Sequence, residues 1–457
     1  MDKISKYDLT SGDILRKLIP LSLPAIAGEL VQMAYNFADM VWLGRLSSGA
    51  VAAAGSVGPF MWLSLTLIVF GQQGAQIGVS QNLGRRDSEA ARGFLNSALV
   101  TALALGILCG TVFFLFRNQF IGFYRIADQV VEQDAVSYLA VVALAMPFTY
   151  LNSTLTAAFN ASGNSVKPFV INLICLALNA ALDPLLIFAA GLGVTGAAIA
   201  TASCQAMSCT LMLLAMKLYK HEQLQALKLL RLPKKEHLKQ MGKWGAPGSF
   251  ETFCFTFFII IVSKIVSSFG SEAMAVQRIG NQIDQFSYMV AGGFGSARYS
   301  AFIGQNYGAG RFDRIRRGLF LSTVIMGCWG TGATFNLLFF NKVFFRWFIP
   351  NEPNVIEMGV SYLKIFALCQ LVASLEGVGG SVFRGHGKTI IPSVISVSTN
   401  VLRVILAWFL SRGALMQNGI WWALVITAFL RGAATYFFSL PVVISRWKNT
   451  APKLTAK

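Results

Sequence analysis

Long apolar stretches separated by short polar connections make up most of this chain. Each stretch is about as long as the roughly 20 apolar residues that an α-helix needs to cross a bilayer. Twelve spans are predicted, near 15–43, 52–80, 94–117, 131–155, 166–190, 194–217, 244–268, 275–304, 317–341, 355–380, 389–411 and 418–445. We therefore expect an all-α integral membrane protein. The longest polar connection divides it into an amino-terminal lobe (1–220), a linker (221–243) and a carboxy-terminal lobe (244–457).

Two sequence patterns recur at a nearly constant offset. The stretch "SQNLGRRDSEAARGFLNSALV" (80–100) resembles "GQNYGAGRFDRIRRGLFLSTV" (304–324), and "FNASGNSVKPF" (159–169) resembles "FRGHGKTIIPS" (383–393). Gln81 and Gln305 are 224 residues apart, as are Pro168 and Pro392. Six spans per repeat is an even number, so both repeats enter the membrane from the same side. The repeat predicts two six-helix lobes related by a pseudo-twofold axis along the membrane normal, with the working cavity between them.

Composition and charge agree with a membrane protein. The chain is 55% hydrophobic and 13% charged, whereas soluble domains average about 25% charged residues. The net charge is +18, and 26 Lys and Arg residues lie on the side of both termini and the linker, against 7 on the opposite side. The positive-inside rule places that side in the cytoplasm. We expect a multi-pass protein of a bacterial cytoplasmic (inner) membrane, whose basic surplus reflects topology and anionic lipid rather than nucleic acid.

The sequence contains no motif typical of metal binding, nucleotide binding or catalysis. The seven cysteines are scattered through apolar segments without CxxC spacing and indicate packing, and the three histidines fall in predicted loops, so no metal site is expected. The "GHGKT" stretch (385–389) has Val382 where a P-loop needs glycine, and no strand precedes it. We find no Ser/His/Asp set, no HExxH and no filter-like repeat. The sequence predicts no enzyme, no channel, no nucleotide and no cofactor, which leaves an ion gradient as the energy source.

The first predicted span carries an unusual polar stripe. Gln32, Tyr35, Asn36 and Asp39 follow the spacing i, i+3, i+4, i+7, which places them on one helix face. A charged aspartate at mid-membrane costs about 2.5–3.5 kcal/mol on insertion scales, a cost that protonation removes. Asp39 is therefore a candidate for loading a proton outside and releasing it inside.

A second stripe lies on the fifth span, where Asn172, Asn179 and Asp183 follow the spacing i, i+7, i+11. Two polar stripes on two helices of one lobe predict a shared hydrated pocket. The alternative is that these groups form interhelical hydrogen bonds that only fix helix packing.

Two prolines, Pro20 and Pro24, precede Asp39 on the first span. Proline frees the carbonyl four residues back and weakens the helix there. We hypothesise that protonation of Asp39 releases its hydrogen bonds to the fifth span, so that the first helix bends at Pro20–Pro24 and expels substrate. A static kink is the alternative.

The chain resembles the MATE (multidrug and toxic compound extrusion) family over essentially its whole length. The resemblance rests on "LSLPAIAGELVQMAYNFADMVWLG" in the first span, the QN-x-G loops of both repeats and "NLICLALNAALDPLLIF" in the fifth span. The last motif is similar to the DinF-type branch. The resemblance implies export of bulky amphipathic compounds, driven by a proton or sodium gradient.

The resemblance also implies site residues. The amino-terminal coupling site falls on Asp39, Asn179 and Asp183, and Pro24 is the bend in the first helix. Its neighbours are Gln32, Tyr35, Tyr138, Asn152 and Thr201. We add Met33 and Asn36 of the first span to the predicted substrate pocket. The NorM-type branch has a sodium site in the second lobe, for which Glu251, Asp284 and Glu376 are the candidates. The aspartate of that branch in the tenth span is absent here, and Glu376 lies about one turn from its position.

We thus expect a monomeric multidrug efflux antiporter that exports amphipathic organic cations in exchange for protons, with sodium as the alternative coupling ion. The alternative is a flippase or exporter of a lipid-linked or other amphipathic anion, which would need arginines in the central cavity. Arg278, Arg298 and Arg403 keep that alternative open if they face the cavity. The intramembrane charges of the second lobe are otherwise interpreted as structural ion pairs, and their basic members are Lys264, Arg278, Arg298, Lys364, Arg403 and Arg431.

Overall fold

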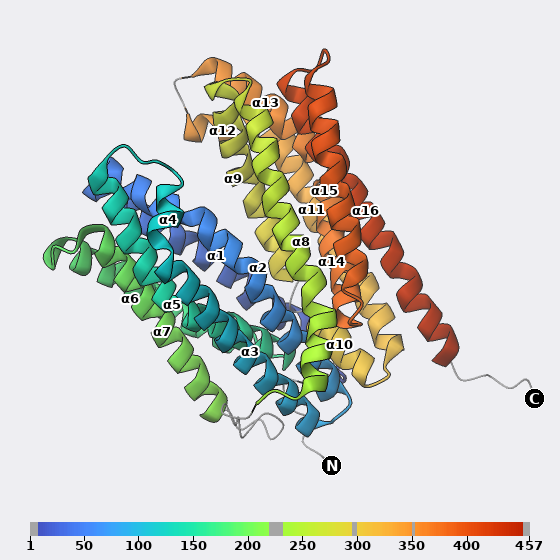
Figure 1. The fold of residues 1–457 in the computed structure, drawn as a ribbon. Coiled ribbons are helices and arrows are strands. Elements are labelled where there is room, and N and C mark those ends of the chain that lie inside the picture. The colour runs from blue at the N-terminus through green and yellow to red at the C-terminus, as the bar shows by residue number, and fades with distance from the viewer. Residues whose placement is uncertain (1–7, 219–231, 295–298, 350–351, 451–457) are drawn as a thin grey trace, which may run out of the picture. The chain divides into compact units, whose positions relative to one another are not determined.

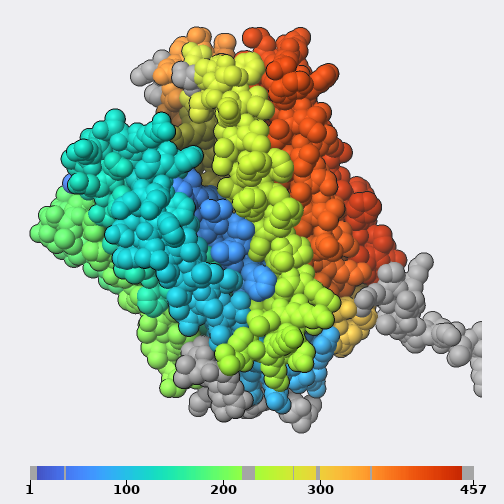
Figure 2. Space-filling view, viewed as in Figure 1, coloured from blue at the N-terminus to red at the C-terminus, as the bar shows by residue number. Residues whose placement is uncertain are grey.

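The regular secondary structure is helical in the part of the chain that its computed structural model describes, residues 8–218, 232–294, 299–349 and 352–450 (Figure 1). It divides into two compact units. The first unit contains Pro20–Ser249, and the second contains Leu9–Ile19 and the chain from Phe250 onward. Two helices, α1 (Leu15–Leu46) and α8 (Lys235–Ser267), therefore contribute residues to both units. On the face seen in Figure 2, the side chains of neighbouring helices within each unit lie against one another.

The first unit is built on α1 from Pro20 onward and on the helices that follow it. These are α2 (Ser48–Gly84), α3 (Ser88–Leu115), α4 (Arg117–Gly122), α5 (Gln129–Ala161), α6 (Val166–Pro184), the π-helical turn η1 (Leu185–Ala189) and α7 (Gly193–Leu218), together with the start of α8.

The second unit contains the remainder of α8 and the helices of the carboxy-terminal half. These are α9 (Ser271–Phe294), α10 (Ser300–Gly308), α11 (Phe312–Phe339), α12 (Asn341–Phe348), α13 (Pro353–Ala367), α14 (Gln370–Gly385), α15 (Ile390–Ser411) and α16 (Gln417–Thr450).

Short polar side chains start several of these helices. Asp13 Oδ1 accepts from the backbone N–H of Arg16 at 2.9 Å at the start of α1, and Ser47 Oγ accepts from Ala50 N–H at 2.9 Å at the start of α2. Asp87 and Asp128 cap α3 and α5 in the same way. Each cap satisfies one backbone donor that has no partner within the helix.

Small residues allow helices of the first unit to approach closely. A Cβ atom at Gly106 of α3 would lie 2.8 Å from Pro147 Cα of α5, and one at Gly110 would lie 2.5 Å from Ala143 O. Because lipid gives helices little hydrophobic reason to associate, such close backbone contacts are a main source of packing energy in membrane bundles.

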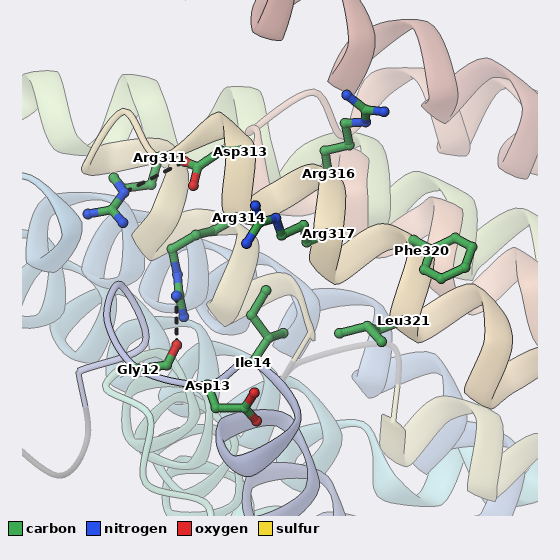
Figure 3. A pocket seen from close by; sticks show the side chains of 10 residues that line it. All are labelled: Gly12, Asp13, Ile14, Arg311, Asp313, Arg314, Arg316, Arg317, Phe320 and Leu321. Atoms are coloured by element: carbon green, nitrogen blue, oxygen red, sulfur yellow. Dashed lines mark hydrogen bonds and ion pairs between the residues drawn. The ribbon is translucent and has the colours of Figure 1, made fainter.

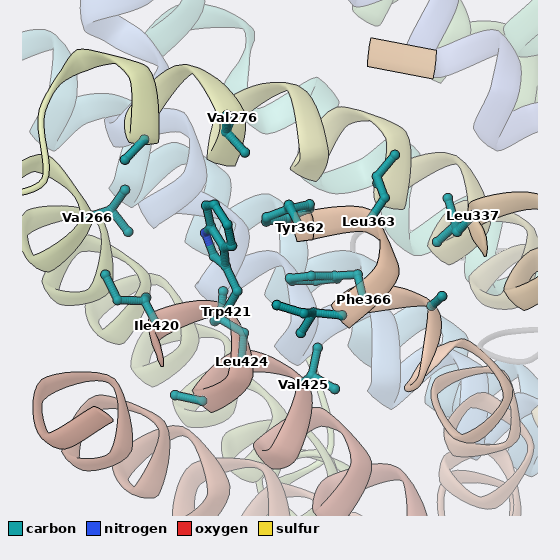
Figure 4. Packing of buried hydrophobic residues seen from close by; sticks show 14 of the residues in the cluster. Val266, Val276, Leu337, Tyr362, Leu363, Phe366, Ile420, Trp421, Leu424 and Val425 are labelled. Atoms are coloured by element: carbon teal, nitrogen blue, oxygen red, sulfur yellow. The ribbon is translucent and has the colours of Figure 1, made fainter. Parts of the chain in front are cut away.

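An aromatic core holds the second unit together (Figure 4). Tyr362 of α13 stacks on Phe366 with ring centroids 4.3 Å apart and meets Trp421 of α16 edge-on at 5.3 Å. Trp421 is fully buried, and its indole N–H donates to Gln277 Oε1 of α9 at 3.2 Å. The core thus joins α9, α13 and α16, and its one buried indole donor is satisfied.

The count of spans differs from the twelve expected. Ten helices of the described part are long and apolar enough to cross a membrane, and a bent pair, α13 and α14, makes an eleventh with a 45° bend. The predicted eighth span, 275–304, corresponds to α9 and α10, and residues 295–298 between them lie outside the described part. Neither helix is among the candidate spans, and α9 carries Glu272, Arg278 and Asp284.

The boundaries of the two units differ from those of the predicted lobes at the start of α1 and at the start of α8. Leu9–Ile19 belongs with the second unit because Leu9 N–H donates to Gln305 Oε1 at 3.1 Å and Leu9 O accepts from Asn306 Nδ2 at 3.1 Å. The start of α8, placed in the linker by the sequence, is helical from Lys235 and packs in the first unit. His237 there lies in a helix rather than a loop, 3.0 Å from Ser97 Oγ through Nδ1.

Candidate ion-coupling and substrate site

Three helices of the first unit bring the predicted coupling residues together. Asp39 lies on α1, Asn179 and Asp183 lie one turn apart on α6, and Thr201 lies on α7. Asn179 and Asp183 are completely buried, and Asp39 is partly buried. The helical periodicity that placed these residues on inward faces therefore brought them to one site.

Asn179 is the centre of this cluster. With its amide group oriented so that the NH₂ faces the acids, the nitrogen lies 3.1 Å from Asp39 Oδ1 and 3.2 Å from Asp183 Oδ2. Thr201 Oγ1 donates to Asp39 Oδ2 at a longer 3.5 Å. The two carboxyl groups also lie within hydrogen-bonding reach of each other. One amide group thus holds two acids, and such a pair can share a proton.

Two further side chains lie close enough to Asp39 and Asp183 to interact with their charges. Tyr138 of α5, predicted to neighbour the site, lies near enough to Asp39 and Asp183 for their charges to act on its hydroxyl. Cys204 of α7, one turn after Thr201, also interacts with both acids and is buried. Sequence reasoning assigned Cys204 only a packing role, and its position three residues after Thr201 was the available signal.

A second polar layer connects α7 to its neighbours. Asn152 Nδ2 of α5 donates to Gln205 O at 2.9 Å and to Gln205 Oε1 at 2.8 Å, and Ser208 Oγ donates to Asn172 Oδ1 of α6 at 3.0 Å. Thr201, Gln205 and Ser208 follow the spacing i, i+4, i+7, a stripe on α7 that the sequence analysis missed. Asn152 therefore joins α5 to α7, and its described hydrogen bonds go to Gln205 rather than to Asp39 or Asp183.

The backbone beside Asp183 is irregular. Pro184 ends α6, and the π-helical turn η1 follows at once. Turns of this kind are rare and occur often at functional sites. The sequence predicted a continuous span over 166–190 and gave no sign of the extra residue in this turn.

The remaining first-unit candidates lie on α1. Gln32 is exposed and Met33 is partly buried, whereas the side chains of Tyr35 and Asn36 lie outside the described part of the structure. Pro20 and Pro24 lie inside α1, which continues through both as one helix. Pro20 is also the first residue of α1 that belongs to the first unit.

The three second-unit acids have separate partners. Glu251 Oε2 accepts from Ser393 Oγ at 2.8 Å, Asp284 Oδ1 accepts from Gln370 Nε2 at 2.6 Å, and Glu376 Oε1 pairs with Arg431 Nε at 2.9 Å. Within the described ranges, no three His, Cys, Asp or Glu side chains form a group that could hold a metal ion. The predicted ion pair within the bundle is present for Glu376 and Arg431.

Other basic residues of the second unit occupy different surroundings. Arg403 is buried on α15, where Nε donates to Thr427 Oγ1 of α16 at 3.0 Å. Lys264 and Arg278 are exposed, and Arg298 lies outside the described residues. At the repeat position of Asn179 the second unit therefore has a buried arginine, and its acids are not gathered on one amide.

Long apolar helices that bury a carboxylate cluster inside one bundle are the architecture of a multi-span membrane protein. The family model MatE matches residues 24–185 and 247–409, one segment in each repeat. The chain belongs to the MatE family, as the resemblance indicated, and is a multi-pass membrane protein.

Curated relatives match most of the chain at low identity. The "Probable multidrug resistance protein NorM" of Thermotoga maritima is 25% identical over 392 residues, which cover 84% of this chain and 82% of that protein. "Probable multidrug resistance protein YpnP" of Bacillus subtilis is 24% identical and covers 87% and 88%. "Multidrug export protein MepA" of Staphylococcus aureus is 21% identical and covers 92% of each chain.

Solved structures share the fold. A crystal structure of MATE in the bent conformation aligns with a TM-score of 0.89 at 19% identity, covering 96% of this chain and 98% of that one. The straight conformation aligns with a TM-score of 0.88 at 19% identity, covering 97% and 99%. These alignments confirm the predicted all-helical fold.

Proposed function

We propose that this protein is a multidrug efflux antiporter that exports amphipathic organic cations in exchange for protons across a bacterial cytoplasmic membrane. One observation carries the proposal: Asn179 holds Asp39 and Asp183 together in the interior of the first unit. The names of the curated relatives support the multidrug substrate class.

The acid pair suits exchange of a proton for a cation. Two ionised carboxylates on one amide repel each other, and either a proton or a substrate cation relieves that repulsion. Because both occupants use the same acids, binding of one disfavours binding of the other. That competition is the basis of obligatory exchange.

Pro20 and Pro24 provide a position at which α1 can bend. When Asp39 is protonated, it no longer accepts charge-assisted hydrogen bonds from Asn179 and Thr201, which are stronger than neutral ones. We propose that α1 then bends at Pro20–Pro24 and displaces the substrate. The existence of bent and straight forms among structures of this fold agrees with such a change.

The anionic-substrate alternative has less support from the described residues. Arg403 donates to Thr427 and Arg431 pairs with Glu376, so these two arginines already have partners within their own unit. At the repeat position of Arg403 the first unit has Asn179, whose partners are the acids Asp39 and Asp183. A cation is therefore the substrate that we propose.

The test is efflux of a fluorescent cationic dye from the full-length protein in everted vesicles. We expect efflux to require a pH gradient, to stop with a protonophore and to be lost in Asp39→Asn. Glu89→Gln, an exposed acid at the start of α3, is the matched control and should transport normally.

Replacing sodium with choline in the same vesicles separates the two coupling ions. Efflux that persists without sodium supports proton coupling. Efflux that needs sodium and ignores the pH gradient, or that is unchanged in Asp39→Asn, would overturn the proposal.

A further inference from the structure

Two short helices carry exposed aromatic side chains beside the ends of long apolar helices (Figure 1). In the first unit α4 follows α3 and precedes α5, and in the second unit α12 follows α11 and precedes α13. The stretches "FRNQFIGFY" (116–124) and "FNKVFFRWF" (340–348) occupy the same place in the two repeats, 224 residues apart. The aromatic residues Phe116, Phe120, Phe123 and Tyr124 thus correspond to Phe340, Phe344, Trp347 and Phe348.

Burial follows the same pattern in both short helices. Ile121 and Phe345, which share one repeat position, are fully buried. Phe123 and Trp347, which share another, are 82% and 88% exposed. A single exposed aromatic side chain on a protein surface needs no explanation. The same exposure at the same position of both repeats indicates that each short helix meets the same kind of partner outside its own unit.

Contacts within each unit hold these helices in place. The ring of Phe120 in α4 lies 5.1 Å from the ring of Phe60 in α2 and 5.1 Å from that of Phe113 in α3. Phe345 of α12 lies directly against Gly359 of α13. One side of each helix is therefore packed on its unit, and the exposed aromatic side chains are held on another side.

The lengths of α3 and α11 place the two short helices at the edge of the bilayer. Arg314 ties the start of α11 to the segment before α1, since its Nη1 donates to Gly12 O at 2.7 Å (Figure 3). Beyond that start, α11 carries no charged residue from Gly318 to Phe339, and α3 carries none from Gly93 to Leu115. Each stretch is about 33–35 Å long, close to the roughly 30 Å of the hydrocarbon core. The short helix that follows then lies at the level of the lipid headgroups.

The charged residues of the two helices fit that level. Arg117 in α4 and Lys342 and Arg346 in α12 are basic, and neither aromatic stretch contains an acidic residue. Aromatic side chains are common where hydrocarbon meets headgroups, and basic side chains beside them can reach lipid phosphates. Hydrocarbon alone would not accommodate the basic residues, whereas the headgroup layer accommodates both kinds of side chain.

We propose that α4 and α12 are interfacial anchors, which insert Phe123 and Trp347 among the lipids at the headgroup level. The partner is the bilayer surface at the ends of α3 and α11, with lipid phosphates beside the basic residues. The buried Ile121 and Phe345 connect each anchor to its unit, so that the anchor sets the depth of that unit in the membrane. This inference does not depend on the proposed antiport.

The test is the membrane depth of a nitroxide label on the full-length protein in liposomes of phosphatidylglycerol and phosphatidylcholine. Labels at Phe123→Cys and Trp347→Cys are compared with a reference near the middle of α3, Leu103→Cys, and one at its start, Glu89→Cys. All four variants also carry Cys328→Ser, which removes an exposed thiol. Depth is measured by collisions with oxygen, which concentrates in hydrocarbon, and with a nickel chelate, which stays in water.

We expect both labels to lie between the two references in depth. A label as deep as the one at Leu103, or as accessible to water as the one at Glu89, would overturn the proposal. A spectrum at Trp347→Cys that is broadened, and that sharpens when unlabelled protein is added, would also overturn it. Such broadening would identify a second copy of the chain as the partner in place of lipid.

A charged substitution tests the anchor directly. With the label at Phe340→Cys, Trp347→Glu should shift the label toward water, whereas the matched control Trp347→Phe should leave its depth unchanged. Because Trp347 is exposed, neither substitution removes a core contact. An unchanged depth in Trp347→Glu, or an equal shift in both variants, would contradict the anchoring role.

Discussion

With its NH₂ oriented toward the acids, the Asn179 amide nitrogen lies 3.1 Å from Asp39 Oδ1, and this contact joins α6 to α1 in the first unit. The same nitrogen lies 3.2 Å from Asp183 Oδ2, whereas the hydroxyl of Thr201 is 3.5 Å from Asp39. The distances therefore rank the amide above the hydroxyl as a partner of the acids, and this ranking can be tested.

Asn179→Leu should impair proton-driven dye efflux much more than Thr201→Val. A hydrogen bond to a charged group contributes about 1.5–3 kcal/mol, so its loss corresponds to roughly 10-fold to 100-fold in rate. Initial efflux rates in everted vesicles measure both variants. Asn172→Leu, on the same helix but bonded to Ser208, is the control, and an equal loss in all three variants would contradict the ranking.

Pro24→Ala should slow efflux several-fold and leave dye binding unchanged. Alanine restores a backbone hydrogen bond and removes a steric clash, which together amount to about 3 kcal/mol in a helix interior, so a straight α1 is favoured. Fluorescence anisotropy measures binding, and vesicle assays measure efflux. Pro59→Ala, which alters a proline inside α2, is the matched control. Normal efflux by Pro24→Ala would argue for a static kink.

Glu376→Gln should destabilise the second unit by about 2 kcal/mol, because it leaves Arg431 without its partner in a mostly buried position. Replacing both residues with methionine should recover most of that loss, since two well-packed apolar side chains often replace an ion pair at little cost. Denaturant unfolding in detergent measures the cycle. Full stability of Glu376→Gln combined with loss of transport would instead indicate a coupling role for Glu376.

Gly110→Ala should destabilise the first unit by about 1–3 kcal/mol, because its new methyl group would overlap Ala143 O of α5. Gly55→Ala in α2 is the matched control, since no atom outside its own helix lies within 4 Å of the new Cβ. There the higher helix propensity of alanine should stabilise the protein by about 1 kcal/mol. Thermal unfolding of both variants in one detergent gives the comparison, and similar melting temperatures would contradict it.

Sequence periodicity predicted the all-helical bundle and the meeting of two polar stripes, but not the contacts around them. Asp39, Asn179 and Asp183 were found because a charged or amide side chain in an apolar helix is conspicuous. Gln205 and Ser208 were missed because small polar residues on a helix often bond their own backbone and attract no notice. Their contacts with Asn152 and Asn172 depend on how three helices pack, which no single-helix pattern contains.

A hydropathy pattern also cannot predict where a helix breaks or in which unit a segment packs, because neither depends on apolar character alone. The bend between α13 and α14 and the π-helical turn after Pro184 are local backbone choices that leave the apolar character unchanged. Leu9–Ile19 joins the second unit through Gln305, Asn306 and Arg314, almost 300 residues away in sequence. Only a three-dimensional contact could reveal that assignment.

The membership of α1 in both units has a consequence for recombination between homologues. A chimera joined in the long linker would combine Leu9–Ile19 from one parent with Gln305 and Arg314 from the other. The hydrogen bonds between these segments would then join residues from two different proteins. Exchangeable modules of this fold must therefore be cut at three junctions, near residues 8, 20 and 249, rather than at one. Gene halves of this family should shuffle less freely than their repeat suggests.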